Sequence, residues 1–394
     1  MPADVFEFAT AGRVRFGSGE VRQAPQALRA IGARRVLVVT GRTLQRSQPL
    51  RSAMADAGID AVAFPVPGEP TVEVARAGTS LVRRHGCDAV VGFGGGGALD
   101  AAKAVAILAT NDGDPLDYLE TVGRGQVLER PALPWVAIPT TAGTGSEVTR
   151  NAVLTVPDAA VKASLRSPLM LARLAIVDPD LLVGLPRPTL AASGLDALSQ
   201  LIEPYLATRA NPLTDALARE GIRRSARSLS PSWADGIDGQ DAAAGQRRED
   251  LALASLFGGL CLANSGLGAV HGFAAPAGGM FAAPHGAVCA ALLAPAMEVN
   301  LRALSARAPD HPSRLRIRHV ATLLTGDDTA SAEDGIAWLR QLCATLAVPG
   351  LAHYGMTEAN VPELVNKAKR ASSMRANPIT LTDEELTEIA LRSL

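Results

Sequence analysis

Three side chains that can bind a transition metal, and one amide close to them, occur in the second half of the sequence. Asp196 and Gln200 are four residues apart, so a helix would place them on one face. His271 and His285 are fourteen residues apart in a segment rich in glycine and alanine. One carboxylate and two imidazoles suit a divalent ion such as Fe²⁺ or Zn²⁺. Each of these residues is also common in purely structural roles, so the residues alone leave both interpretations open.

A run of four glycines begins the segment GGGGALDAAK at residues 94–103, directly after the apolar run DAVVGF. Such glycines let the backbone approach a pyrophosphate, and the N–H groups of a following helix favour its negative charge. The segment matches neither G-x-G-x-x-G nor the P-loop pattern, and a flexible turn is the alternative. Its place between an expected strand and an expected helix favours phosphate binding.

A second polar loop, PTTAGTGSE at residues 139–147, begins at the last residue of the apolar run WVAIP. Ligands of open α/β sheets bind at the carboxyl ends of the strands, where this loop is expected. Alternatively, Thr144 or Ser146 accepts the first N–H groups of the next helix as a cap. The two roles are compatible.

The elements that must position these residues differ between the two halves of the chain. Apolar, β-branched runs in the first half predict strands at 35–40, 61–66, 88–93, 135–139 and 174–178. Their alternation with helical stretches predicts an α/β domain whose parallel sheet is covered on both faces. Alanine and leucine at helical spacing predict helices at 188–207, 213–229, 248–264 and 286–305. We therefore expect an α/β domain over 1–185 and an all-α domain over 186–394, with a surface loop at 231–247.

Composition excludes several classes of protein. The 394 residues suit two domains with a cleft between them. The 38 Lys and Arg residues balance 39 Asp and Glu residues, so no overall field is available to attract nucleic acid or an anionic membrane. The four cysteines form no CxxC pair, which argues against a disulfide framework or a zinc knuckle. With no secretory signal and no uninterrupted apolar span, a cytoplasmic protein that acts on a small molecule is expected.

Taken together and in order, the motifs GGGGALDAAK, PTTAGTGSE, GLDAL and GLGAVHGF…PHG resemble those of the iron-containing (group III) alcohol dehydrogenases. The resemblance extends from VRFGSG at 14–19 to ANPITLT at 376–382. It implies a dehydroquinate synthase-like architecture, with a dinucleotide-binding domain followed by a helical domain. It also implies a homodimer that transfers hydride between NAD or NADP and a small alcohol or aldehyde, with a metal as Lewis acid.

The resemblance assigns roles to the residues of both loops. It implies pyrophosphate contacts at Gly95, Gly96, Gly97 and Asp100, with Lys103 nearby. It implies that ribose and phosphates are lined by Thr140, Thr141, Thr144 and Ser146, and that Lys162 approaches the nicotinamide ribose. Gly41 ends the run RVLVVT where NAD-preferring relatives often have Asp. Its lack of charge, beside Arg42, makes NADP use plausible, and a simple end of the strand is the equal alternative.

The metal site departs from the family pattern of Asp, His, His and His. The matching positions are Asp196, Gln200, His271 and His285, and a glutamine oxygen is a weaker donor than imidazole. Ala275 stands where many members have a further His near the substrate. Two alternatives therefore stay open. One is a metal-independent enzyme like the maleylacetate reductases, in which His271 or His285 donates the proton. The other is a catalytically silent nucleotide-binding protein.

Overall fold

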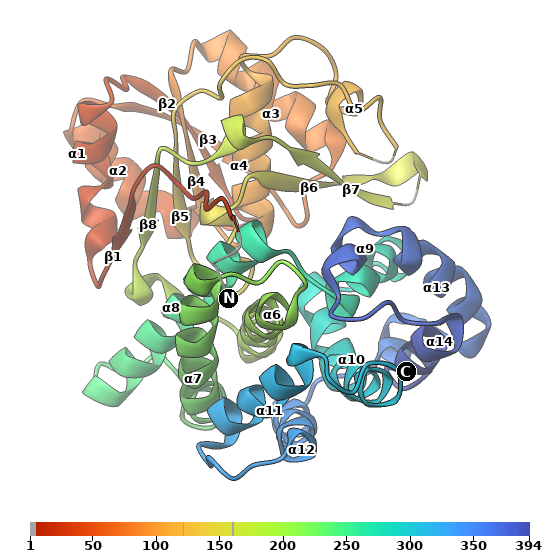
Figure 1. Cartoon of the computed structure of the whole chain (residues 1–394). Helices are drawn as coiled ribbons and strands as arrows, with labels where there is room; N and C mark the ends of the chain where they lie inside the picture. Colours follow the sequence, from red (N-terminus) through yellow and green to blue (C-terminus); the bar gives the residue numbers. More distant parts are fainter. Residues whose placement is uncertain (1–4, 121, 160) are drawn as a thin grey trace. The chain divides into compact units, whose positions relative to one another are not determined.

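Six parallel strands form the sheet of the first half of the chain (Figure 1); the sequence predicted the parallel sheet and five of these strands, but not β1. In the computed structural model, which describes residues 5–120, 122–159 and 161–394, the strand order is β1-β8-β5-β4-β2-β3. Their bounds are β1 (Val14–Phe16), β2 (Arg35–Thr40), β3 (Asp60–Pro65), β4 (Ala89–Gly94), β5 (Trp135–Pro139) and β8 (Leu174–Val177). All five pairings between neighbours are parallel, with β2 Val36 opposite β4 Ala89.

The central strands are apolar on both sides because helices cover both faces of the sheet. Every residue of β4 and β5 is buried. Helices α1 (Ala24–Ala30) and α2 (Gln48–Asp56) pack on one face, where Leu28 and Met54 meet Val36 and Val91. Helices α3 (Val72–His85) and α4 (Gly96–Leu108) cover the other face (Figure 1). Ten of the thirteen residues of α4 are buried, so this helix is a fixed support for the loop that precedes it.

A two-stranded antiparallel hairpin, which the sequence analysis missed, packs beside α4. It consists of β6 (Asn151–Val156) and β7 (Val161–Arg166). Alternate residues of β6 are buried, and Leu154 belongs to the same core cluster as Ala104 and Ile107 of α4. The short helix α5 (Pro115–Tyr118) lies nearby in the chain and begins at a capping box formed by Asp114 and Asp117.

The direction in which the chain crosses the sheet reverses between β2 and β4. The chain passes from β2 outward to β3, then returns to the other side of β2 and continues through β4 and β5. Ligands of open α/β sheets bind at such a reversal, outside the carboxyl ends of the strands. Residues that follow β2 and β4 are therefore well placed for a nucleotide.

The second half of the chain is helical, as predicted. No strand occurs in residues 184–394, all of which the structure describes. The helices are α6 (Arg187–Leu206), α7 (Pro212–Asp235), α8 (Ala242–Ser265), α9 (Ala269–Phe281), α10 (His285–Arg307), α11 (Pro312–Thr325), α12 (Ala332–Thr345), α13 (Val361–Arg370) and α14 (Asp383–Leu391). Helix α6 is buried almost throughout from Leu190 onward and packs against α7, α8 and α10.

The surface loop predicted at 231–247 is much shorter in the structure. Helix α7 continues to Asp235 despite an internal Pro231, and α8 begins at Ala242. Asp241 caps α8 by accepting a hydrogen bond from the Ala244 backbone N–H. Asp and Ala in this segment therefore start a helix, and only residues 236–241 connect the two helices.

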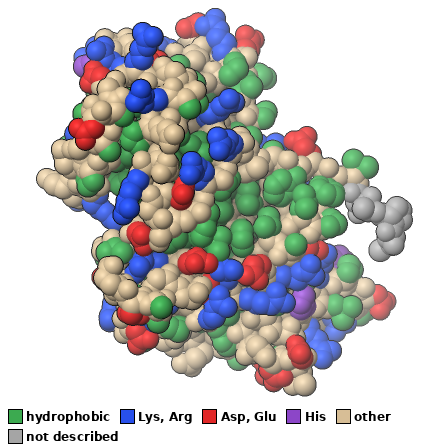
Figure 2. All heavy atoms as spheres, turned by 90° about the vertical axis from the view of Figure 1, so that its left-hand side faces the viewer, with side chains coloured by type: hydrophobic (Ala, Val, Ile, Leu, Met, Phe, Trp, Pro, Cys, Tyr) green, Lys and Arg blue, Asp and Glu red, His purple; other side chains and the backbone are tan. Residues whose placement is uncertain are grey.

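The chain divides into two compact units. One contains residues 9–141 and 145–183, and the other contains residues 142–144 and 184–394 together with a short segment that ends at Phe8. Helix α10 is long and apolar enough to cross a membrane by length and composition, but it is mostly buried, as is usual for a core helix. On the face shown in Figure 2, Lys and Arg side chains are interspersed with Asp and Glu.

Candidate functional site

Four side chains with metal-binding atoms meet inside the helical unit. Asp196 comes from α6, His271 from the first turn of α9, and His285 and Cys289 from the first two turns of α10. One ligand atom from each lies within 4.8 Å of those from all the others. The structure thus brings together three of the four metal ligands expected from the sequence, and it adds a cysteine.

Asp196 is the centre of this group. Its Oδ1 lies 3.4 Å from Nε2 of His271 and 3.6 Å from Nε2 of His285. The same oxygen is buried and has no hydrogen-bond partner among the described residues. A buried acceptor without a partner costs on the order of 1–3 kcal/mol, and a bound cation would satisfy it. The donor set therefore fits a divalent metal ion.

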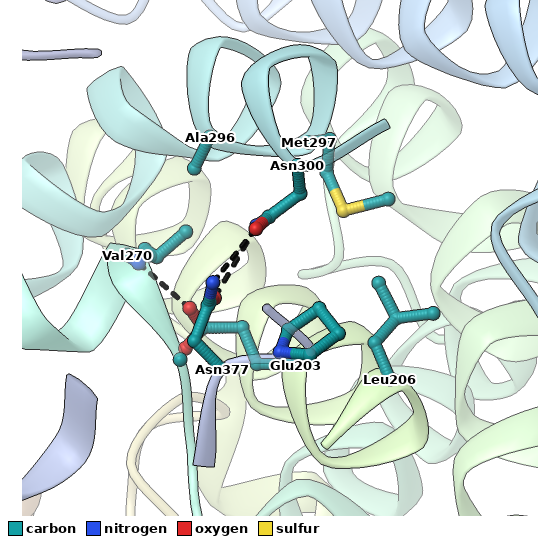
Figure 3. A pocket seen from close by; sticks show the side chains of 9 residues that line it. Glu203, Leu206, Val270, Ala296, Met297, Asn300 and Asn377 are labelled. Carbon is teal, nitrogen blue, oxygen red and sulfur yellow. Dashed lines mark hydrogen bonds between the residues drawn. The ribbon is translucent and has the colours of Figure 1, made fainter. Parts of the chain in front are cut away.

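Glu203 fixes the orientation of His271. Its Oε2 lies 2.6 Å from Nδ1 of His271, and its Oε1 accepts the backbone N–H of Val270 at 2.7 Å (Figure 3). Since an ionised carboxylate only accepts hydrogen bonds, Nδ1 carries a proton, and Nε2 is the nitrogen that faces Asp196 and could bind a metal. This is the arrangement that holds a metal-binding histidine in one tautomer.

The start of α9 is anchored from behind by two asparagines. Oδ1 of Asn377 accepts the backbone N–H of Ala269 at 3.0 Å, and Nδ2 of Asn377 donates to Oδ1 of Asn300 at 2.7 Å. These side chains and Glu203 line a small pocket under the helix (Figure 3). The support around His271 is therefore made of buried, mutually hydrogen-bonded groups.

The electrostatics of the group favour positive charge. Burial acts to lower the pKa of both imidazoles, but their interactions with Cys289 and Asp196 outweigh it. As a result, the pKa of His285 rises to about 9, and that of His271 rises well above its usual value. Burial acts to raise the pKa of Asp196, yet the neighbouring imidazoles bring it below its ordinary value.

Gln200 lies beside this group as expected, one turn after Asp196. Its side chain helps to lower the pKa of Asp196, while its buried Oε1 has no hydrogen-bond partner among the described residues. A Cβ atom built on Gly258 of α8 would lie 3.5 Å from that oxygen. Ala275, the other departure from the family pattern, is a half-buried residue one turn after His271 in α9.

Glu203 and Cys289 were missed by the sequence analysis, although helical spacing carries a signal for both. Glu203 follows Asp196 by seven residues, and Cys289 follows His285 by four, so each shares a helix face with an expected ligand. The cysteines had been considered as partners for other cysteines. Comparing each cysteine with histidines at helical spacing would have found Cys289.

The glycine loop of the α/β unit starts α4 at the carboxyl end of β4. Gly95 is the N-cap of α4, and a Cβ atom built on it would lie 3.2 Å from Oγ1 of Thr141. At Gly97 such an atom would lie 2.6 Å from the carbonyl oxygen of Gly68, too close for any side chain. The backbone N–H of Thr140 donates to the carbonyl of Gly94 at 2.9 Å. The two loops expected to bind the nucleotide therefore lie side by side.

Asp100, Lys103 and Ser146 form a buried network behind this loop. Oγ of Ser146 donates to Oδ1 of Asp100 at 2.5 Å, and the backbone N–H of Val153 donates to Oδ2 of Asp100 at 2.9 Å. Lys103 is fully buried and donates to Oγ of Ser146, Oγ1 of Thr149 and the carbonyl of Asn151. The network ties α4 to β6 and to the second polar loop.

The alternative role of Thr144 or Ser146 as a helix cap is not found at the second loop. The short 3-10 helix Ser146–Val148 has Gly145 as its N-cap, and no side chain makes the cap hydrogen bond. Gly145 has a φ of 58°, a conformation that glycine adopts without strain. The Ser146 hydroxyl is used by Asp100 and Lys103 instead.

Three expected cofactor residues remain, and they lie in three different segments of the chain. Gly41 directly follows β2, and its backbone nitrogen would be 3.2 Å from a Cβ atom built on Gly94. Lys162 of β7 forms an ion pair with Glu69, whose Cα lies close to Gly97. Thr144 belongs to the segment 142–144, which groups with the helical unit.

A buried carboxyl group beside Lys103 gives the first prediction. Glu147 is 2% exposed, and burial raises its pKa from the ordinary 4.5 to about 7, although Lys103 acts to lower it. Between these values the folded chain holds a proton that the unfolded chain releases, so stability falls as pH rises through this range. Between pH 5 and pH 8, wild type should therefore lose ~3 kcal/mol of unfolding free energy through this group. Glu147→Gln lacks the titrating carboxyl group and should not show this loss.

Urea unfolding followed by circular dichroism at both pH values measures this difference. Glu129→Gln, which changes an exposed carboxylate of the same unit, is the matched control and should leave the pH dependence unchanged. The prediction fails if Glu147→Gln and wild type show the same dependence on pH.

Comparison with known proteins shows which family the chain belongs to. Residues 11–179 match the iron-containing alcohol dehydrogenases, and residues 190–394 match the C-terminal part of the Fe-containing alcohol dehydrogenase family. The chain belongs to the iron-containing alcohol dehydrogenase family. It is an oxidoreductase, an alcohol dehydrogenase.

The similarity spans nearly the whole chain. Choline dehydrogenase of Bacillus subtilis (strain 168) is 32% identical over 386 residues, covering 96% of this chain and 92% of that protein. NAD-dependent methanol dehydrogenase of Bacillus methanolicus is 33% identical over 384 residues, covering 96% and 97%. The crystal structure of a 1,3-propanediol oxidoreductase superposes with a TM-score of 0.90 at 31% identity, covering 99% of this chain and 100% of that one.

Proposed function

We propose that the protein interconverts a small alcohol and its carbonyl compound by hydride transfer to or from NAD or NADP at a divalent metal site. The observation that carries the proposal is the convergence of Asp196, His271 and His285 on one buried point. A divalent cation held there would act as a Lewis acid on the carbonyl oxygen and contribute several kcal/mol to stabilising the developing alkoxide.

The chain's own residues supply the positioning. Glu203 keeps the proton of His271 on Nδ1, so that Nε2 stays available as a donor. Gln200 supports the Asp196 carboxylate through its side chain. The side chain of His285 is 34% exposed whereas that of His271 is 5% exposed, so a substrate would approach from the His285 side.

The glycine loop and its neighbours support the cofactor part of the proposal. The N-terminus of α4 offers free N–H groups behind Gly95 at the point where the sheet reverses direction. We assign pyrophosphate to Gly95, Gly96 and Gly97. Thr140, Thr141, Thr144 and Lys162 would line the riboses and phosphates, while Asp100, Lys103 and Ser146 hold the loop in place.

Several relatives are named for small alcohols, whereas one that is 33% identical is named a long-chain-alcohol dehydrogenase. Choline, methanol and 1,3-propanediol are all small alcohols. We propose a short-chain alcohol or aldehyde for this chain, and a cytoplasmic homodimer as its working form. The cluster of Asp196, His271, His285 and Cys289 argues against a silent nucleotide-binding protein, because a nucleotide sensor needs no group of buried metal-binding side chains.

Oxidation of NADH and NADPH with a panel of short aldehydes and with maleylacetate tests the proposal. Turnover of an aldehyde should disappear after chelation and return when Zn²⁺ or Fe²⁺ is added. Turnover that survives chelation would overturn the Lewis-acid role and favour proton donation by a histidine. Cofactor binding without turnover of any carbonyl would favour the silent binder.

Cofactor choice gives the second prediction. A Cβ atom built on Gly41 meets nothing within 4 Å, so an aspartate fits there without strain. A carboxylate at the end of β2 binds the 2′-hydroxyl of NAD and repels the 2′-phosphate of NADP. Gly41→Asp should lower kcat/KM for NADPH at least tenfold relative to that for NADH, about 1.4 kcal/mol.

The matched control is Gly41→Asn, which has the same shape without the charge and should shift the ratio much less. Steady-state kinetics with both cofactors measures the effect. An unchanged ratio in Gly41→Asp would show that the 2′ position lies elsewhere.

A further inference from the structure

The proposed metal site has an unusual fourth position. Asp196, His271 and His285 supply three donors, and Gln200 stands one turn after Asp196, where a fourth would be expected. However, the oxygen of Gln200 lies beside Gly258 of α8, and the side chain of Gln200 interacts with Asp196 so as to lower the pKa of that carboxyl. Gln200 therefore acts as a support for Asp196.

Cys289 is the side chain that could supply the fourth donor in place of Gln200. It is fully buried on α10, one turn after His285, and its Sγ lies 3.7 Å from Nε2 of His271 and 3.7 Å from Nε2 of His285. Its side chain thus faces the nitrogen atoms that are available for a metal. The other cysteines of this unit point to backbone instead, because Cys261 donates to the carbonyl of Thr214 and Cys343 to that of Ala290.

The spacing of the donors matches one tetrahedral ion. Metal bonds of about 2.0–2.1 Å to nitrogen or oxygen and about 2.3 Å to sulfur place tetrahedral N and O donors about 3.3 Å apart, and N and S donors about 3.6 Å apart. The observed separations are 3.4 and 3.6 Å between Asp196 and the two imidazoles and 3.7 Å from each imidazole to sulfur. Octahedral neighbours would be closer, at about 3.0 Å.

The charges of the donors also favour a thiolate ligand. Among the four donors, Asp196 and a Cys289 thiolate carry two negative charges and two neutral imidazoles carry none, so a divalent ion makes the donor set neutral. Without the thiolate, the second charge of the ion would be balanced only by Glu203, which lies behind His271 and does not reach the ion. A thiolate in contact with the ion balances that charge at shorter range, so it favours binding in this buried site.

Resting on the function proposed above, we propose that the Cys289 thiolate is the fourth protein ligand, replacing an imidazole, and that the site takes Zn²⁺ in preference to Fe²⁺. On binding, the thiol proton leaves to solvent and one sulfur–metal bond forms, with no change in oxidation state. Thiolate in a tetrahedral set with imidazole and carboxylate is typical of zinc, and such a zinc ion can expand to five ligands, so four protein donors are compatible with the Lewis-acid role proposed above.

Cobalt substitution of the full-length protein tests this directly. Co²⁺ takes the geometry of Zn²⁺, and a bound thiolate adds a sulfur-to-cobalt charge-transfer band in the near ultraviolet to its visible bands. We expect both sets of bands in wild type and in Cys261→Ser, a matched control for another buried cysteine of the helical unit. In Cys289→Ser the charge-transfer band should vanish, and affinity for Zn²⁺ should fall by more than the roughly 10–100-fold that the loss of an outer partner causes.

A second variant separates a ligand from a packing residue. Adding Gln200→His to Cys289→Ser supplies an imidazole one turn after Asp196, so Co²⁺ and Zn²⁺ binding should return without the charge-transfer band. A merely structural role for Cys289 would not be rescued in this way. Competition between Zn²⁺ and Fe²⁺ at equal concentration, read by elemental analysis, should favour Zn²⁺ in wild type.

The outcomes distinguish this inference from the proposed function. Visible cobalt bands without a charge-transfer band in wild type would overturn the thiolate ligand and leave the metal-dependent function standing. Failure of wild type to bind Co²⁺, Zn²⁺ or Fe²⁺ would overturn both. Equal loading with Fe²⁺ in the competition would overturn the preference for zinc.

Discussion

Asp196→Asn should lose its bound metal and reduce aldehydes roughly a thousandfold more slowly than wild type, because several kcal/mol of alkoxide stabilisation are lost with the ion. The Oδ1 of Asp196 lies close to both imidazoles, at 3.4 and 3.6 Å. An amide has the same shape, so α6 keeps its packing, but the neutral oxygen is a poor partner for a divalent ion. Steady-state kinetics and elemental analysis measure the two effects.

Nucleotide binding should be unaffected by this change, since the glycine loop belongs to the other compact unit. The matched control is Asp383→Asn, which alters an exposed aspartate paired with Lys369 and should leave both activity and metal content near wild type. If Asp196→Asn keeps its metal but loses activity, Asp196 acts on the substrate itself. If Asp196→Asn keeps both its metal and its activity, Asp196 is not a metal ligand.

Much of the fold follows from patterns that are local in the sequence. The bounds of β2 and β5 equal the predicted ones, because a continuous apolar run ends abruptly at a polar loop in both cases. The hairpin β6–β7 escaped detection because its strands alternate buried and half-buried residues next to α4. Strand β1, only three residues long and containing Arg15, exists because it pairs with β8, a contact far along the chain.

The candidate site, like the fold, was predictable only where the signal is local in the sequence. The ligands Asp196, His271 and His285 could be found because their types suit a metal and their neighbours match a family. The buried network of Lys103 depends on partners more than forty residues away, which no local pattern shows. The role of Cys289 depends on α9 and α10 meeting at their first turns, and the sequence contains only half of that information, the spacing of four from His285.

A second large effect is expected at a residue that touches the ligands without being one of them. Glu203→Gln should weaken metal binding by about a hundredfold and lower kcat by between roughly 10²- and 10⁴-fold. The carboxylate accepts from two donors, Nδ1 of His271 at 2.6 Å and the backbone N–H of Val270 at 2.7 Å. A glutamine cannot accept from both, because one of its two terminal atoms is an N–H donor.

Either orientation of the new amide does damage. With the oxygen toward Val270, the NH₂ group faces Nδ1 of His271 and moves the ring proton to Nε2, the nitrogen that should hold the metal. With the oxygen toward His271, two donors oppose each other at the start of α9, where backbone positions depend on the Val270 hydrogen bond. The large effect therefore stems from the tautomer or position of His271, and the affinity for NAD(P)H should not change.

Cobalt titration and steady-state kinetics of Glu203→Gln separate this positioning role from a general loss of structure. Glu203→Asp, which keeps two acceptor oxygens on a shorter arm, should recover part of the metal affinity. Glu298→Gln, a change to a partly exposed glutamate of α10, is the control and should bind cobalt like wild type. Wild-type metal affinity in Glu203→Gln would contradict the assignment, because Nε2 of His271 would then not depend on the carboxylate behind it.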